Sequence, residues 1–180
     1  MNVTITSPFW KQRRDQIVES VIPYQWGVMN DEIATEVPDD PAGNQLADNK
    51  SHAVENLRIA AGDEAGEFHG MVFQDSDIYK WLEEAAYALS YHPDPQLREL
   101  CDKTVDLIAR AQQSDGYLDT PYQIKTGEWA HRERFTLIQQ SHEMYVMGHY
   151  IEAAVAYHEV TGNQQALDVC LLYTSPSPRD

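Results

Sequence analysis

One stretch of the sequence combines reactive residue types with the spacing of a helix. Residues 135–160 contain no proline and are rich in helix-forming and apolar residues. His142, Glu143, His149 and Glu152 lie inside its apolar run. His142 and His149 are seven residues apart, so they share one helix face with Tyr145 between them. A helix that is apolar on every side is typically buried, and its polar groups then need partners. The pattern indicates either a polar network in a core or one wall of a site for a polar ligand.

The same spacing excludes the metal sites that a His-Glu pair first suggests. An HExxH zinc-protease motif starting at His142 needs a second histidine at position 146, where the sequence has Val146. Two histidines seven residues apart are not a usual pair of zinc ligands either. If this stretch lines a site, we therefore expect hydrogen bonds to a polar ligand such as a sugar and no bound metal; core histidines bonded to their neighbours are the alternative.

The composition excludes several classes of partner. Asp and Glu number 29 against 13 Lys and Arg, which gives a formal net charge of −16. Nucleic acids and anionic membrane surfaces reward basic patches, so we expect neither as a partner. The sequence contains no run of about 18 apolar residues, so it predicts no membrane-spanning helix, and its first residues lack a signal-peptide pattern. We expect a cytoplasmic protein, and the two cysteines predict no disulfide framework.

Apolar periodicity and capping residues predict a series of helices. They cover residues 9–29, 51–62, 75–91, 95–111 and 135–160, with a further helix from Gln164. The run from Asp75 to Asp77 is expected to cap the third helix, Asp94 to cap the fourth, and Gly162 to end the fifth. Pro23 is expected to kink or divide the first helix. The short link between the third and fourth helices predicts an antiparallel pair.

The alternation of buried and amphipathic helices, with longer loops at one end, predicts an all-α fold built from antiparallel helical hairpins. Arrays of this kind occur in α/α toroids and in solenoids. The hairpins are not close repeats of one another, so the fixed-period repeat families are disfavoured. Helix propensity alone leaves toroid and solenoid open.

Six motifs follow one another along the chain. They are Thr6-Ser-Pro-Phe-Trp10, Gln45, Val72-Phe-Gln-Asp-Ser-Asp77, Tyr79-Lys-Trp-Leu-Glu83, Gln112-Gln-Ser-Asp-Gly-Tyr-Leu-Asp119 and Ser141-His-Glu-Met-Tyr-Val-Met-Gly-His-Tyr-Ile-Glu-Ala-Ala154. In this order and spacing, from Met1 to about Val169, they resemble glycoside hydrolase family 127. The resemblance implies an incomplete (α/α)6 barrel, a fragment of a retaining exo-glycosidase that releases terminal β-L-arabinofuranose from arabinooligosaccharides.

The resemblance also implies where the reactive groups of the full-length enzyme lie. A zinc-bound cysteine nucleophile, a glutamate acid/base and the Cys and Glu zinc ligands belong to a later part of the barrel. We therefore expect no catalytic residue and no zinc ligand in this chain, and we do not assign Cys101 or Cys170 as a nucleophile. A homo-oligomer of the full-length protein is compatible with the resemblance.

Four residues are candidates for binding the sugar. The resemblance matches His142 to a residue lining the subsite for the terminal sugar, and Gln45 to a loop residue that reaches that sugar. Phe73 and Tyr145 are candidates for pocket walls, although aromatic packing in the core is an alternative for both. Neutral histidine and glutamine each donate and accept hydrogen bonds, as the hydroxyls of a furanose require.

Neighbouring polar residues are expected to have structural roles. Glu143 and His149 are predicted to be buried framework partners, and Asp75 is predicted to be a helix N-cap. Two other functions stay open. An unsaturated glucuronyl hydrolase would use an aspartate acid/base, for which Asp115 is the candidate, although a turn role beside Gly116 is an alternative. A helical interaction module would have no activity.

The end of the chain departs from the helical pattern. Pro176 and Pro178 follow soon after the helix that starts at Gln164. Residues 170–180 resemble a translated sequencing adaptor. We expect residues 1–169 to be the N-terminal part of the barrel domain and residues 170–180 to be a non-native tail.

Overall fold

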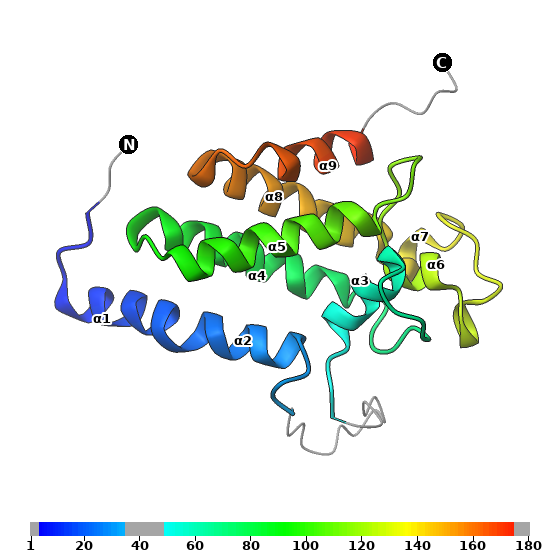
Figure 1. Ribbon diagram of the computed structural model, residues 1–180, viewed down its shortest axis with the longest axis horizontal. Coiled ribbons are helices and arrows are strands. Elements are labelled where there is room, and N and C mark those ends of the chain that lie inside the picture. Colours follow the sequence, from blue (N-terminus) through cyan, green and yellow to red (C-terminus); the bar gives the residue numbers. More distant parts are fainter. Residues whose placement is uncertain (1–3, 35–48, 175–180) are drawn as a thin grey trace.

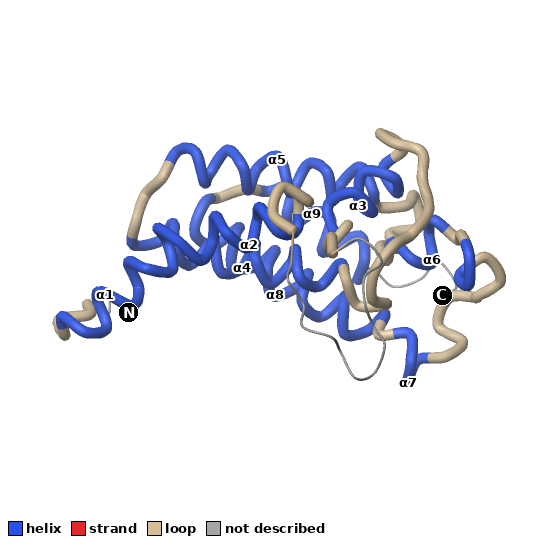
Figure 2. The backbone as a smooth tube through the Cα atoms, turned by 90° about the horizontal axis from the view of Figure 1, so that it is seen from below, coloured by secondary structure: helices blue, strands red, loops and turns tan. Residues whose placement is uncertain are grey.

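Figure 1 shows the computed structural model of the chain, which describes residues 4–34 and 49–174. Within these two ranges every regular element is a helix and no strand occurs (Figure 2). The all-α prediction is therefore confirmed. In chain order the elements are α1 (Pro8–Gln16), the π-helical η1 (Ile17–Val21), α2 (Ile22–Met29), α3 (Ala53–Ala61), α4 (Asp75–Tyr91), α5 (Pro95–Ala111), α6 (Thr120–Ile124), the 3-10 turn η2 (Gly127–Trp129), α7 (Ile138–Ser141), α8 (Glu143–Thr161) and α9 (Gln164–Thr174).

Two predicted capping residues set helix boundaries. Asp94 accepts hydrogen bonds from the backbone N–H groups of Gln96 and Leu97 at 2.8 and 3.2 Å, so it caps α5. Gly162 ends α8 with a φ of 73°, the left-handed conformation that glycine adopts without a steric penalty. Each cap satisfies backbone groups that the helix itself leaves without a partner.

The first helical stretch is divided, as predicted from Pro23. The division is a π-helical segment between two α-helices. The π-helical segment η1 lies just before Pro23, which cannot donate a backbone hydrogen bond to the preceding turn. Beyond it, α2 packs on α4. The Trp26 and Trp81 rings lie 4.7 Å apart, and the Trp81 indole N–H donates to the Ile22 carbonyl at 3.1 Å.

α4 and α8 are neighbours that run in the same direction (Figure 1). Near their starts the rings of Phe73 and His142 lie 5.3 Å apart, and further along the rings of Tyr79 and Tyr150 lie 5.0 Å apart. α5 and α9 return in the opposite direction after short links. α4 and α8 therefore begin at one end of the molecule, which also holds the longer loops, and we call it the loop end.

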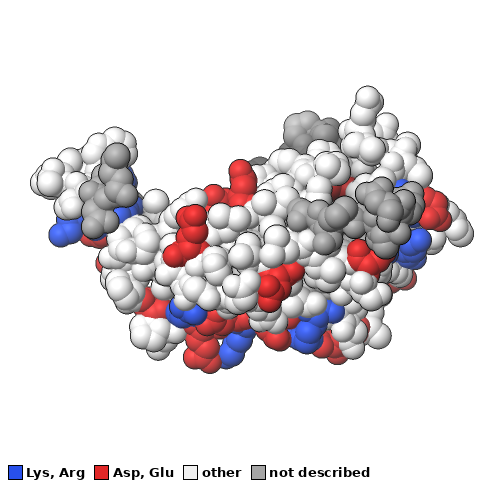
Figure 3. All heavy atoms as spheres, turned by 90° about the horizontal axis from the view of Figure 1, so that it is seen from above, with Lys and Arg blue, Asp and Glu red and all other residues white. Residues whose placement is uncertain are grey.

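α8 is not buried on every side, so that expectation is wrong. Val146, Tyr150 and Tyr157 are buried. Met144 and Tyr145, by contrast, are 51% and 44% exposed. Figure 3 looks at the molecule from the α9 side and shows broad areas without acidic or basic side chains. The apolar residues of α8 thus extend over more of the helix surface than the described helices bury.

Cys101 has the packing role expected from its helix face. It lies on the buried side of α5 with none of its surface exposed. Burial raises the pKa of its thiol to about 12, so the thiol stays protonated near neutral pH. A protonated thiol is a poor nucleophile and a poor metal ligand.

Asp75 does not cap α4, so this prediction is wrong. Gln74 precedes the helix, and Asp75 is its first residue, with 1% of its surface exposed. Its two carboxylate oxygens accept hydrogen bonds from the backbone N–H and the hydroxyl of Thr120, both at 2.7 Å. The carboxylate joins the start of α4 to the start of α6 and does not accept hydrogen bonds from the first backbone N–H groups of α4. Burial raises the pKa of Asp75 to about 6, although the Thr120 hydrogen bonds oppose the shift.

A second acidic side chain at the loop end is fully buried. Asp119 has no exposed surface, and within the described part of the chain neither carboxylate oxygen has a hydrogen-bond partner. Burial raises its pKa well above the ordinary value, and the charges of Asp75 and Glu143 add to the shift.

We expect Asp75→Asn to flatten the dependence of stability on pH. The pKa of Asp75 rises from 3.8 to about 6 on folding. The contribution of the protonated Asp75 to the free energy of unfolding is therefore complete below about pH 4 and is lost as the pH rises through 6, about 3 kcal/mol in total. Asparagine can keep both bonds to Thr120 without ionising. Urea unfolding at pH 4, 5, 6 and 7 measures the slope.

Asp168→Asn is the control, because Asp168 is exposed on α9 and its replacement should leave the slope of the parent chain unchanged. Equal slopes for the parent and Asp75→Asn would contradict the raised pKa.

Candidate functional site

The stretch that was predicted as one helix, residues 135–160, is interrupted at His142. α7 ends at Ser141, and α8 begins at Glu143. Between them His142 adopts a φ of 56° and a ψ of 7°, in the left-handed region. Histidine rarely takes this conformation, and a left-handed residue breaks the repeating i to i−4 hydrogen bonds of a helix. The interruption exposes the His142 side chain at the loop end, so the alternative of a core histidine does not hold for His142.

Three of the four candidate sugar-binding side chains lie together. The His142 ring is 5.3 Å from the Phe73 ring and 5.8 Å from the Tyr145 ring, both in edge-on contacts. No hydrogen bond or ion pair joins the His142 imidazole to any residue in the described ranges 4–34 and 49–174. Both ring nitrogens are therefore available for hydrogen bonds to a ligand. Gln45 lies outside the described residues.

The aromatic row continues along α8. The Tyr145 ring lies 4.5 Å from the His149 ring, and the Lys80 ammonium lies 5.0 Å from the Tyr145 ring centre. His149 is half-buried, in place of the fully buried position expected for it, and its Nδ1 lies 3.4 Å from a Glu152 carboxylate oxygen. The sequence interpretation missed Lys80, although positions 77, 80 and 84 share one face of α4 by helical spacing. Lys80 also borders a hollow of about 340 Å³ between α2 and α4.

Glu143 is the buried framework partner that the sequence predicts. Only 1% of its surface is exposed. Its carboxylate accepts hydrogen bonds from the Tyr117 hydroxyl at 2.5 Å and from the Phe135 backbone N–H at 2.9 and 3.1 Å. Burial raises the pKa of Tyr117, and the carboxylates of Asp119 and Glu143 raise it further. The phenol therefore remains a neutral donor to Glu143.

Asp115 has a turn role and is unsuited to act as a general acid. Its carboxylate accepts hydrogen bonds from the Tyr117 backbone N–H at 3.1 Å and from Arg134 at 2.8 Å. The Tyr117 bond lowers the pKa of Asp115, and Arg134 lowers it further. A general acid at neutral pH needs a raised pKa. This geometry disfavours the glucuronyl-hydrolase alternative, which depends on Asp115.

One cluster has the residue types of a metal site. The ligand atoms of Asp31, His52 and Glu55 lie within 4.8 Å of one another, the single such group of three in residues 4–34 and 49–174. His52 Nδ1 is 2.5 Å from a Glu55 oxygen and 3.7 Å from an Asp31 oxygen, so hydrogen bonding and charge pairing account for the arrangement. Neither Cys101 nor Cys170 belongs to the cluster. These residues do not fit the cysteine-bound zinc that the resemblance implies for the full-length enzyme.

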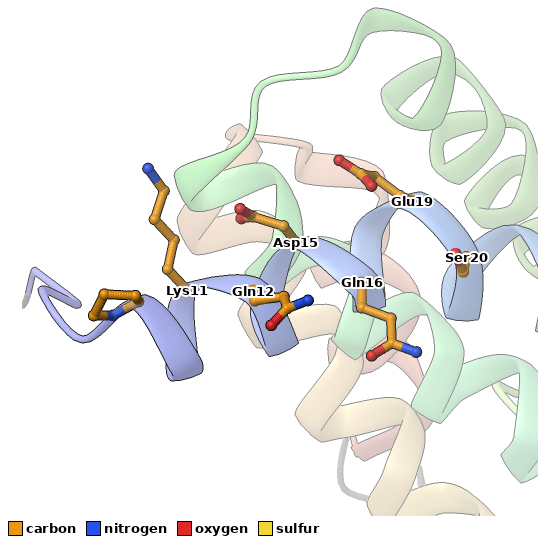
Figure 4. A pocket seen from close by; sticks show the side chains of 7 residues that line it. Lys11, Gln12, Asp15, Gln16, Glu19 and Ser20 are labelled. Carbon is orange, nitrogen blue, oxygen red and sulfur yellow. The ribbon is translucent and has the colours of Figure 1, made fainter.

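A hollow of about 610 Å³ lies along α1 and η1, away from the loop end. Figure 4 shows its polar lining, which includes Lys11, Asp15 and Glu19. None of the three described candidates, His142, Phe73 and Tyr145, borders it. We therefore place the candidate site at the loop end, around His142.

Comparison with known proteins identifies the family. A family model described as β-L-arabinofuranosidase, GH127 catalytic domain, matches residues 2–175. A non-reducing end β-L-arabinofuranosidase from Bifidobacterium longum subsp. longum is 85% identical over 169 residues, which are 94% of this chain and 26% of that protein.

Solved structures agree in fold. A GH127 β-L-arabinofuranosidase from Geobacillus stearothermophilus T6 superposes with a TM-score of 0.83 at 47% identity, covering 96% of this chain and 25% of the other. A second GH127 β-arabinofuranosidase gives a TM-score of 0.78 at 31% identity, covering 95% of this chain and 25% of the other.

The described helices are thus part of an α/α barrel, and the chain spans about a quarter of the length of the relatives it matches. The sequence over residues 2–175 and the arrangement of the helices agree, and the chain belongs to glycoside hydrolase family 127.

Proposed function

We propose that this chain is the N-terminal part of a retaining exo-glycosidase that releases terminal β-L-arabinofuranose from arabinooligosaccharides. The observation that carries the proposal is the 85% identity to a non-reducing end β-L-arabinofuranosidase over 94% of this chain. The aromatic row at the loop end supports it, because His142 and Tyr145 are exposed and Phe73 is half-buried against the core. A sugar needs both hydrogen-bonding groups and flat apolar surfaces. An activity-free helical module does not require such a row.

In this proposal His142 and Gln45 form hydrogen bonds to the hydroxyls of the terminal sugar. Phe73 and Tyr145 form walls on either side of the His142 imidazole, consistent with their ring contacts of 5.3 and 5.8 Å to it. A site that satisfies the hydroxyls of one sugar discriminates strongly against sugars that lack them.

The groups that break the glycosidic bond are proposed to lie in other parts of the enzyme. Retaining hydrolysis needs a nucleophile and an acid/base. Zinc bound there would hold a cysteine as its thiolate. A cytoplasmic location is also proposed, supported by Cys101 being a buried free thiol. No helix in the described ranges is long and apolar enough to cross a membrane. A homo-oligomer of the full-length protein is compatible with the proposal.

We expect His142→Ala in the full-length enzyme to lower kcat/KM for p-nitrophenyl β-L-arabinofuranoside about 100-fold, because transition-state hydrogen bonds to the sugar are lost. Steady-state release of nitrophenol measures the effect. His92→Ala is the matched control, since His92 is exposed at the opposite end of α4 and should leave the kinetics unchanged. Normal kinetics in a folded His142→Ala enzyme would refute sugar binding by this residue.

We expect the 180-residue chain by itself to be inactive. It offers no thiol that could become a nucleophile, because Cys101 and Cys170 are both buried and burial raises the pKa of each. The purified chain should release no nitrophenol from the same substrate and should carry no stoichiometric zinc. Release that depends on added zinc would show that the reactive groups lie within this chain.

We propose that residues 170–180 are a non-native tail. The match to the Bifidobacterium enzyme spans 169 residues, which supports a change near this point, although α9 itself runs to Thr174. Sequencing of the source locus is expected to show a different reading frame after about Val169. A genomic stop codon directly after Asp180 would overturn the proposal.

A further inference from the structure

We propose that Glu143 is a positioning residue that holds His142 in place for the sugar, an inference that rests on the proposed function. Glu143 is the residue after His142 and begins α8. Its side chain is buried, whereas the His142 imidazole is exposed at the loop end. Glu143 therefore acts through the backbone and does not touch the ligand.

The Glu143 carboxylate closes residues 135–143 into a loop. One of its oxygens accepts from the Tyr117 hydroxyl at 2.5 Å, and both accept from the Phe135 N–H at 2.9 and 3.1 Å. Hydrogen bonds to a charged acceptor are stronger than those between neutral groups. The position of Glu143 at the start of a 19-residue helix also favours a negative charge there.

The two ends of this loop have strained backbones. Phe135 and His142 have φ values of 57° and 56°, in the left-handed region that side chains with a Cβ rarely adopt. Each such residue costs roughly 1–2 kcal/mol and persists only where surrounding contacts enforce it. The Glu143 carboxylate accepts a hydrogen bond from Phe135, and Glu143 directly follows His142 in the sequence. Its hydrogen bonds are therefore well placed to offset the strain at both residues.

The partners of Glu143 are themselves held in place. The Tyr117 ring packs edge-on against Phe135 at 5.6 Å, and the Arg134 guanidinium lies 3.8 Å from the Tyr117 ring centre. The His142 imidazole forms no hydrogen bond to the described residues, whereas the His142 backbone carbonyl accepts from the Val146 N–H at 2.9 Å. Its direction is therefore set by the backbone turn and by the rings of Phe73 and Tyr145.

A double-mutant cycle in the full-length enzyme separates positioning from general stability. We expect Glu143→Ala to lower kcat/KM for p-nitrophenyl β-L-arabinofuranoside about tenfold. Glu143→Gln should stay within about threefold of the parent, because its carbonyl oxygen can accept the same bonds. In the His142→Ala background, Glu143→Ala should cost less than about twofold, since residues that act through one another are not additive.

Two further variants test whether a loss of activity comes only from a general loss of structure. Tyr157→Phe removes hydrogen bonds to Asp102 and Arg98 at the other end of α8 and should leave kcat/KM unchanged. Where Glu143→Ala does not accumulate as folded protein, Tyr117→Phe replaces it, because it removes the hydroxyl donor alone. It should lower kcat/KM about threefold in the parent and have no effect beside His142→Ala.

Hydrogen exchange at the Phe135 amide reports the loop without using activity. In the folded enzyme the exchange should be faster in Glu143→Ala than in the parent. An equal loss of kcat/KM in both backgrounds, or unchanged amide exchange, would overturn the positioning role. Normal kinetics of His142→Ala together with faster exchange would instead reject the proposed sugar contact while leaving the loop closure intact.

Discussion

The loop end of this molecule depends on buried carboxylates that bond to distant backbone. Asp75 and Glu143 are the first residues of α4 and α8, and each accepts a backbone hydrogen bond from another segment. The partial positive charge of a long helix at its N-terminus makes a carboxylate tolerable there without a basic partner. Through these bonds α4 holds the start of α6, and α8 holds the loop after η2. The arrangement of the candidate site follows from these attachments.

The parallel course of α4 and α8 gives the site its composition. Because both helices begin at the loop end, Phe73 before α4 and His142 before α8 come within 5.3 Å of each other. Tyr145 lies one turn into α8 and extends the row. Residues 69 positions apart in the sequence thereby form one surface, with the imidazole between two aromatic edges. Backbone geometry and ring contacts orient this imidazole. Among the described residues, none forms a hydrogen bond to it.

The helices were predictable where the signal is local. Asp94 and Gly162 marked their helix ends correctly because capping involves only neighbouring residues. Asp75 was misassigned because its partner, Thr120, is 45 residues away and no local rule indicates it. The turn at His142 was missed for a similar reason, since histidine gives no sign of a left-handed backbone. The family motifs indicated His142, Phe73 and Tyr145 as site candidates, but the sequence did not show that Lys80 approaches Tyr145.

The N-terminal helix has a consequence for the order in which the chain opens. α1 has no buried residue, and Phe9 and Trp10 are 54% and 61% exposed, whereas burial begins in η1 with Val18. A segment without buried contacts opens at little free-energy cost, while the core opens only with global unfolding. α1 is thus a region of fraying, and the π-helical turn is the boundary at which cooperative structure begins.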